Sequence, residues 1–140
     1  MNILTHFVVI DDDAANNKIC SVTLSKLSDN ANIKTFLDPV TGFNHIATEY
    51  ADNDHDHTCV LFLDINMPVM NGWEFLERFD KLEESVKKRV KIYILSSSVD
   101  KNDIALANQN KNVIHYLIKP LTKETIRLVT YSQNRDVKSQ

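Results

Sequence analysis

The apolar residues of this chain gather in short runs, and stretches with helical spacing separate the runs. Four of the runs are Phe7–Ile10, Val60–Leu63, Ile92–Leu95 and Val113–Ile118. Runs of this length are too short for a helix and are typical of buried strands. A further strand is predicted where apolar and polar residues alternate after residue 31. With flanking residues included, the predicted strands cover 6–10, 32–37, 58–63, 91–95 and 113–118.

Helical patterns fill the intervals between these strands. Helices are predicted over 14–28, from Asp38-Pro39 onward, from Asn71-Gly72 onward, after the N-cap Asp100 and after the cap Thr122. The first of these helices has one apolar face, which consists of Ile19, Cys20, Thr23, Leu24 and Leu27.

Three further predictions concern helix ends and connections. Asn110 and Asn112 are expected to end the helix that follows Asp100, because asparagine tolerates the left-handed conformation. The highly charged stretch over 81–91 is predicted to be an irregular surface connection. Either acid of the pair at 11 and 12 could cap the helix over 14–28, with the acid at 13 pointing to solvent.

Strands and helices alternate along the whole chain, with no internal repeat and no long linker. This order predicts one doubly wound α/β domain, a five-stranded parallel sheet with helices on both faces. Three of the apolar runs lack alternation, as strands covered on both faces do. The domain is expected to span 1–131, and the polar residues 132–140 are expected to form a loose tail. With 140 residues, the chain has no room for a second domain.

The composition excludes several classes of protein. A net charge of −3 and a pI near 5.9 argue against a nonspecific nucleic-acid binder. No apolar stretch approaches the roughly 20 residues that cross a bilayer, and the N-terminus lacks a signal-peptide pattern. A soluble cytoplasmic protein without a membrane partner is therefore expected. Cys20 and Cys59 belong to no CxxC pair and are expected to be small core residues in a reducing compartment.

Polar side chains stand where four of the predicted strands end. Asp11 and Asp12 follow the first strand, Asp64 the third, Ser96 the fourth and Lys119 the fifth. The carboxyl ends of parallel strands form the crevice in which ligands bind. Carboxylates that meet there repel one another, so a proton or a cation has to settle among them. Magnesium, which prefers oxygen ligands, fits this set of side chains.

The residues around Asp64 and Lys119 form an informative combination. Asp64 is followed by Asn66 and Pro68, and Lys119 directly precedes a proline. Together with the acidic pair after the first strand, these residues make the chain resemble a response-regulator receiver domain, the phosphoacceptor module of two-component signalling. The resemblance covers about residues 6–131. It implies a flavodoxin-like fold of the receiver type and a stand-alone, single-domain regulator.

This resemblance implies a role for each residue of the site. Asp64 resembles the phosphoacceptor, Lys119 the phosphate-pairing lysine and Ser96 the hydroxyl that contacts the phosphoryl group. The implied magnesium ligands are Asp11 (through water), Asp12, Asp64 and the backbone carbonyl of Asn66. Tyr116 occupies the aromatic switch position. Through it, the face formed by the helix after residue 100, the strand 113–118 and the last helix would change on phosphorylation.

The resemblance also implies a signalling protein rather than an enzyme. The chain would take a phosphoryl group from a histidine kinase or a histidine phosphotransfer protein in a reaction that needs Mg²⁺. It would catalyse only its own phosphorylation and dephosphorylation, and it would signal by docking to an unknown downstream protein. The oligomeric state is open between a monomer and a phosphorylation-dependent dimer.

Two other functions remain open at this point. A phosphorylation-independent adaptor would keep the fold without the switch, although every expected site group is present. A haloacid-dehalogenase-like phosphatase also uses an aspartate at a strand end. That class needs a second aspartate two residues later, where this chain has Asn66.

The segment Asp52–His57 could form a separate metal site. His55 and His57 would lie on one side of an extended chain. Soft-metal sites need a more fixed geometry and a supporting shell of hydrogen bonds. A solvated acidic loop is therefore the favoured interpretation.

Overall fold

The chain alternates strands and helices as predicted, and the computed structural model describes residues 6–27, 29–51 and 58–129. The strands are β1 (His6–Ile10), β2 (Asn32–Phe36), β3 (Cys59–Leu63), β4 (Val90–Ser96) and β5 (Val113–Ile118). The helices are α1 (Ala14–Ser25), α2 (Pro39–Glu49), α3 (Gly72–Asp80), α4 (Glu84–Arg89) and α5 (Lys101–Gln109), and another helix covers 123–129. The predictions for the segment 52–57 and the tail 132–140 lie outside the described residues.

All five strands are parallel and lie in the order β2-β1-β3-β4-β5. The order reverses between β1 and β3, because the chain leaves β1 for β2 on one side and returns as β3 on the other. In such a sheet the crevice at the reversal opens at the carboxyl ends of the two strands. Ile10 pairs with Leu63 in the register, so the residues that follow β1 and β3 leave the sheet side by side.

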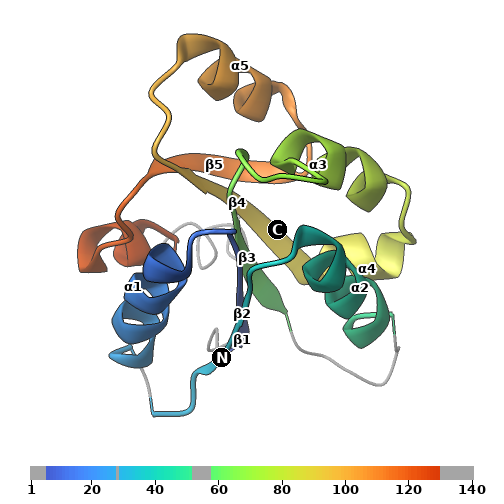
Figure 1. The fold of residues 1–140 in the computed structure, drawn as a ribbon. Coiled ribbons are helices and arrows are strands. Elements are labelled where there is room, and N and C mark those ends of the chain that lie inside the picture. The colour runs from blue at the N-terminus through green and yellow to red at the C-terminus, as the bar shows by residue number, and fades with distance from the viewer. Residues whose placement is uncertain (1–5, 28, 52–57, 130–140) are drawn as a thin grey trace.

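Helices cover both faces of the sheet, and each face has its own apolar core (Figure 1). On one face, α2, α3 and α4 pack through residues such as Ile46, Phe75 and Val86, and α5 joins them. On the other face, α1 packs through Cys20 and Leu24, beside the helix over 123–129. β1, β3 and β4 are almost completely buried because both faces are covered. The predicted doubly wound sheet is therefore confirmed, and both cysteines are free and buried.

The apolar face predicted for α1 is partly wrong. Cys20 and Leu24 are buried, but 45% of Ile19 and 44% of Leu27 are exposed. The helix also ends at Ser25, before the predicted boundary. The buried stripe instead passes through Asn16, which lies four residues before Cys20, so the helix turns a polar residue inward.

Asp13 caps α1, not Asp11 or Asp12. The Asp13 carboxylate accepts hydrogen bonds from the backbone N–H groups of Ala15 at 2.9 Å and Asn16 at 3.4 Å. These bonds satisfy two of the free donors at the start of the helix. Asp13 is exposed, as expected, and the pair before it is left free for other contacts.

The charged stretch before β4 is a short helix, α4, and not an irregular connection. The Val86 side chain of α4 is buried against the sheet. Tertiary packing therefore stabilises a helix whose sequence contains few apolar residues. Glu84 lies in its first turn and Lys87 in its last, which suits the helix dipole, and the two side chains pair at 3.1 Å.

The end of α5 also differs from the prediction. Asn110 follows the helix with φ −83° and ψ 120°, which is extended and not left-handed backbone. Its side-chain oxygen accepts a hydrogen bond from the N–H of Asn112 at 2.9 Å. Asparagine ends this helix through that local turn, in which its side chain competes with helical hydrogen bonding. Asp100 and Thr122 do cap α5 and the last helix as predicted. Among the described residues, no helix has the length and apolar character that a membrane crossing requires.

Candidate functional site

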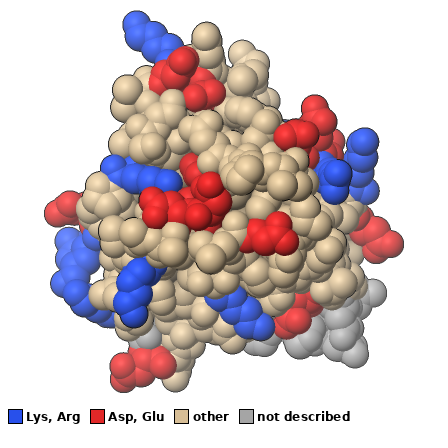
Figure 2. Space-filling view, viewed as in Figure 1, with Lys and Arg blue, Asp and Glu red and all other residues tan. Residues whose placement is uncertain are grey.

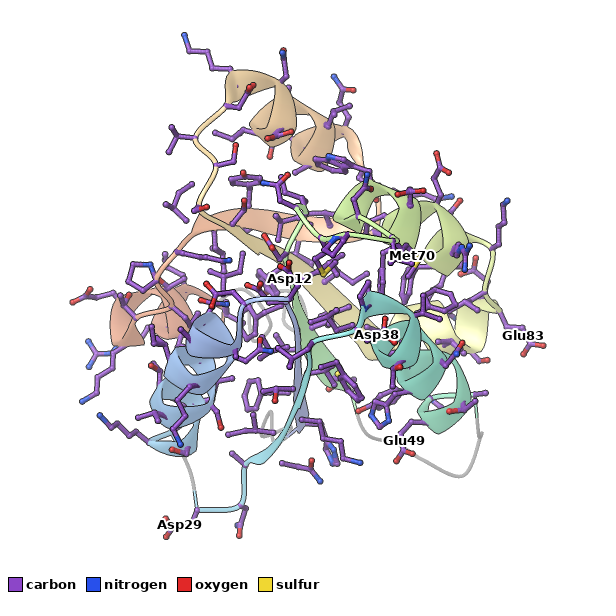
Figure 3. The ribbon with its side chains drawn as sticks, viewed as in Figure 1. Asp12, Asp29, Asp38, Glu49, Met70 and Glu83 are labelled. Atoms are coloured by element: carbon purple, nitrogen blue, oxygen red, sulfur yellow. The ribbon has the colours of Figure 1, made fainter. Side chains whose placement is uncertain are left out.

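The carboxylates predicted to meet at the sheet edge are brought together. Asp11 directly follows β1, Asp64 directly follows β3, and the N–H of Asp64 donates to the carbonyl of Ile10 at 3.0 Å. Oxygen atoms of Asp11, Asp12 and Asp64 all lie within 4.8 Å of one another. Figure 2 shows acidic side chains gathered near the middle of this face with a basic group beside them, and Figure 3 shows Asp12 at the turn from β1 into α1. The reversal of strand order thus places three acids at one point.

Asp11 is the most enclosed of the three acids, with 1% of the residue exposed. Its Oδ1 accepts a hydrogen bond from the N–H of Asp13 at 2.9 Å. Its Oδ2 accepts one from Nδ2 of Asn16 at 2.8 Å and pairs with Nζ of Lys119 at 2.6 Å. A buried carboxylate is tolerated when donors surround it in this way.

Lys119 brings a positive charge to the acids from the end of β5. Its N–H donates to the carbonyl of Ser96 at 2.9 Å, which continues the pairing of β5 with β4. Its Nζ lies 2.6 Å from Asp11 and 3.8 Å from Oδ1 of Asp64. Burial alone would lower the pKa of this ammonium, but the hydrogen bond to Asp11 and the nearby carboxylate charges outweigh burial and raise it. Lys119 therefore stays charged at neutral pH.

Asp64 is buried, and its environment favours the protonated acid. Burial, followed by the charge of Asp11, raises the pKa of Asp64 to about 6. Lys119 and the backbone N–H groups of Asn66 and Ile65 lower the pKa and offset part of that rise. One ammonium does not neutralise three acids, so the site retains an unmet demand for positive charge.

The residues present fit a magnesium ion. Three carboxylate oxygens within 4.8 Å of one another supply the hard oxygen ligands that Mg²⁺ prefers. Asp12 is exposed and can reach solvent, which suits an ion that keeps part of its water shell. Asn66, whose backbone carbonyl was the further expected ligand, lies exposed in the loop after Asp64.

We expect the magnesium affinity to fall as the pH drops below about 6. The raised pKa of Asp64 means that protons compete with the cation for this carboxylate below that pH. The magnesium affinity should be constant above about pH 6 and should fall by up to about tenfold per pH unit below that value. Calorimetric titration with MgCl₂ across this range checks the expectation. A flat affinity would contradict it, and Asp64→Asn should remove the pH dependence that belongs to this group.

Ser98 connects Ser96 with Tyr116. Ser96 is fully buried, and its Oγ accepts a hydrogen bond from the N–H of Ser98 at 3.1 Å. The Ser98 carbonyl accepts one from the hydroxyl of Tyr116 at 2.8 Å. The Ser98 hydroxyl donates to Asp103 of α5 at 2.8 Å. A change at the Ser96 hydroxyl can therefore reach both β5 and α5 through one residue.

The loop between β3 and α3 is held against the site by a glycine. The N–H of Gly72 donates to the carbonyl of Ile65 at 3.0 Å. A Cβ at this glycine would lie 2.7 Å from Cα of Ile65 and 2.8 Å from the carbonyl oxygen of Asp64. Those are backbone atoms and cannot move aside, so α3 can approach Asp64 this closely only with glycine at its first position. Val69 in the same loop has a φ of 71° and is 88% exposed.

Asn16 is a member of the site that the sequence pattern did not single out. Only 5% of it is exposed, although asparagine is usually a surface residue. The signal was available, because Asn16, Cys20 and Leu24 share the four-residue spacing of one helix face. A polar residue on a buried stripe, close to the acids, indicates a specific partner.

A family model described as response regulator receiver domain matches residues 7–130. Among curated proteins, the chain is 31% identical over 117 residues to Stress response regulator protein 1 of Scheffersomyces stipitis. That match covers 84% of this chain and 37% of the relative, so the chain spans well under half of the relative's length.

Solved structures give the same assignment. A two component response regulator from Cytophaga hutchinsonii is similar with a TM-score of 0.82 and 26% identity, and the match covers 94% of this chain and 97% of that one. A response regulator receiver protein from Dyadobacter fermentans is similar with a TM-score of 0.78 and 28% identity, over 89% and 93% of the two chains. Both are response regulators.

Proposed function

Because the chain belongs to the response regulator receiver domain family of two-component signalling, we propose that Asp64 accepts a phosphoryl group in a reaction that needs Mg²⁺. The donor would be a histidine kinase or a histidine phosphotransfer protein, the proteins with which receiver domains interact. Receiver domains are signalling proteins and not classical enzymes, so the reactions proposed are only the chain's own phosphorylation and dephosphorylation, in the cytoplasm. The observation that carries this proposal is the buried Asp64 carboxylate, which lies beside two other acids and the Lys119 ammonium.

The transfer would form a bond between a carboxylate oxygen of Asp64 and phosphorus. The bond between phosphorus and the imidazole nitrogen of the donor would break. Imidazole is a good leaving group, so the protein has mainly to align the two groups and neutralise charge. A magnesium ion bound by Asp12, Asp64 and the Asn66 carbonyl, and by Asp11 through water, would supply part of that neutralisation.

Besides the magnesium ion, the Lys119 side chain would supply positive charge to the reaction. Its Nζ lies closer to Asp11, at 2.6 Å, than to Asp64, at 3.8 Å. A phosphoryl group on Asp64 would add negatively charged oxygens on that side, and the ammonium would move toward them. The Ser96 hydroxyl would supply a hydrogen bond to the same oxygens.

The output would pass through Ser98. If the Ser96 hydroxyl turns toward the phosphoryl group, the N–H of Ser98 loses its acceptor, and the loop that also binds Tyr116 and Asp103 can shift. The docking surface would be the face of α5, β5 and the helix over 123–129. Leu106 of α5 is 49% exposed and Ile118 of β5 is 43% exposed, which suits docking of an as yet unidentified protein, or of a second copy.

We expect Tyr116→Phe to separate phosphorylation from its output. The variant loses the hydrogen bond to the Ser98 carbonyl but keeps the ring, so phosphoryl incorporation at Asp64 should remain within about twofold. Amide shifts in α5 that follow BeF₃⁻ addition should become smaller than in the unchanged protein. Shifts in α5 of the same size would show that the Tyr116 hydroxyl takes no part in the switch.

Incubation with acetyl phosphate and MgCl₂, followed by intact-mass measurement, tests the proposed function. A phosphoryl adduct that hydroxylamine removes is expected, because an acyl phosphate is labile to this nucleophile and a phosphate ester is not. No adduct from acetyl phosphate or from any phosphohistidine donor, with no BeF₃⁻-induced amide shifts, would favour the phosphorylation-independent adaptor. Turnover of small phosphomonoesters would favour the phosphatase, which Asn66 argues against.

A further inference from the structure

Asn16 and Lys119 donate to the same oxygen atom. Nδ2 of Asn16 lies 2.8 Å from Oδ2 of Asp11, and Nζ of Lys119 lies 2.6 Å from it. A carboxylate oxygen only accepts hydrogen bonds, so the amide must present its nitrogen to Asp11. Oδ1 of Asp11 is held separately by the N–H of Asp13 at 2.9 Å. Two neutral donors and one cation thus fix a single carboxylate.

Phosphorylation of Asp64 would affect the two side-chain donors, Asn16 and Lys119, differently. Lys119 is needed both by Asp11 and by a phosphoryl group on Asp64, and it cannot remain fully with the first when it serves the second. Without another donor, Oδ2 of Asp11 would then be buried and unpaired, and the carboxylate could rotate. Asn16 cannot leave in the same way, because it sits in the first turn of α1 and is 5% exposed.

We propose that Asn16 is a positioning residue that keeps the Asp11 carboxylate oriented toward the cation while Lys119 moves to the phosphoryl group. This inference rests on the proposed function. A neutral amide suits the task, because it fixes the carboxylate without adding a charge that would repel Mg²⁺. Hydrogen-bond partners of metal-binding side chains commonly change metal affinity by about tenfold or more when they are removed.

Asn16→Leu tests this role, because leucine has nearly the shape of asparagine and no donor. We expect the dissociation constant for Mg²⁺, measured by calorimetry, to rise about tenfold. The magnesium concentration that gives half-maximal phosphorylation by acetyl phosphate should rise with it. The rate at saturating magnesium should stay within about threefold, since Asn16 touches no reacting atom. A residue needed only for folding would not produce this separation of affinity from rate.

Asn17→Leu is the matched control. Asn17 is equally buried at 5% exposure, lies on the same turn, and donates to the backbone carbonyl of Asp11 at 3.0 Å and not to the carboxylate. Its replacement should lower stability about as much but leave the magnesium affinity within about twofold. Asn16→Ala replaces Asn16→Leu if the latter does not fold, because it removes the same amide and leaves room for water.

The outcomes distinguish this inference from the proposed function. An unchanged protein that binds no Mg²⁺ and takes up no phosphoryl group would overturn the proposed function. An unchanged protein that does both, together with an Asn16 variant of equal magnesium affinity, would overturn the role of Asn16 alone. Equal weakening by the Asn17 variant would also overturn it, because the effect would then belong to the packing of α1.

Discussion

Asp64→Asn is expected to abolish phosphoryl incorporation and, without Mg²⁺, to make the protein more stable near neutral pH. The amide has no carboxylate oxygen to attack phosphorus, so the mass adduct should disappear. The stability gain follows from the raised pKa of Asp64, which means that the ionised group is disfavoured in the folded protein. The protonated Asp64 side chain contributes to the stability of the fold at a pH below the ordinary pKa of aspartate. This contribution to the free energy of unfolding is lost as the pH rises through about 6, where Asp64 ionises in the folded protein. Above that pH, removing the charge should stabilise by roughly 1–3 kcal/mol.

Urea unfolding without Mg²⁺, at a pH below 5 and a pH above 7, measures this difference. The gain from Asp64→Asn should be clearly larger at the higher pH. Asp12→Asn serves as the control, because Asp12 is exposed and its removal should change stability much less. Equal gains at both pH values would contradict the raised pKa. A phosphoryl adduct on the asparagine variant would show that another residue accepts the group.

Gly72→Ala is expected to damage both the fold and the site. The added Cβ would meet Cα of Ile65 at 2.7 Å and the carbonyl oxygen of Asp64 at 2.8 Å, so either α3 or the Asp64 backbone has to shift. A backbone clash of this kind typically lowers the free energy of unfolding by about 2–4 kcal/mol. Because the displaced atoms carry Asp64, the rate of phosphorylation by acetyl phosphate should fall at least tenfold in the protein that remains folded.

Gly42→Ala provides the comparison. Its Cβ would meet Cδ1 of Ile10 at 2.7 Å, Cγ1 of Ile10 at 2.9 Å and Cβ of Phe36 at 3.3 Å, which are all side-chain atoms and not atoms of the backbone that carries Asp64. The variant should lose about 1–3 kcal/mol of stability and keep its phosphorylation rate within about twofold. Urea unfolding and the acetyl phosphate assay on both variants decide the matter. A Gly72 variant no worse than the Gly42 variant in both would show that the loop after β3 is less tightly placed than its contacts indicate.

The sheet and the meeting of the acids could be predicted because each depends on a simple rule. Uninterrupted apolar runs have to be buried on both faces, and parallel strands end at one edge, so Asp11 and Asp64 were expected at the same edge of the sheet. The observed strand order makes them neighbours there. The sequence did not show which of three consecutive acids caps α1, because the choice depends on the residue at which the backbone passes from the extended conformation of Asp13 into the helix.

What was not predicted depends on where the helices and loops lie in the folded protein. α4 is stabilised because Val86 packs against the sheet, and the local sequence pattern does not predict this packing. The helix spacing placed Asn16 on the buried face with Cys20 and Leu24, but its role depends on the Asp11 carboxylate, which it meets only once the helix has been placed. Tyr116 and Ser96 were both named from the resemblance, but the serine that links them, Ser98, emerges only from the hydrogen bonds.

The strand order also has a mechanical consequence. The acids are rooted in β1 and β3, each of which is held by a neighbour on both sides, whereas Lys119 is rooted in β5, which borders only β4. The acidic side chains of the site are thus attached to central strands of the sheet, and the lysine is attached to an edge strand. If Lys119 is displaced relative to the acids, β5 should therefore move more than β1 and β3. Amide hydrogen exchange should then speed up in β5 while β1 and β3 stay protected.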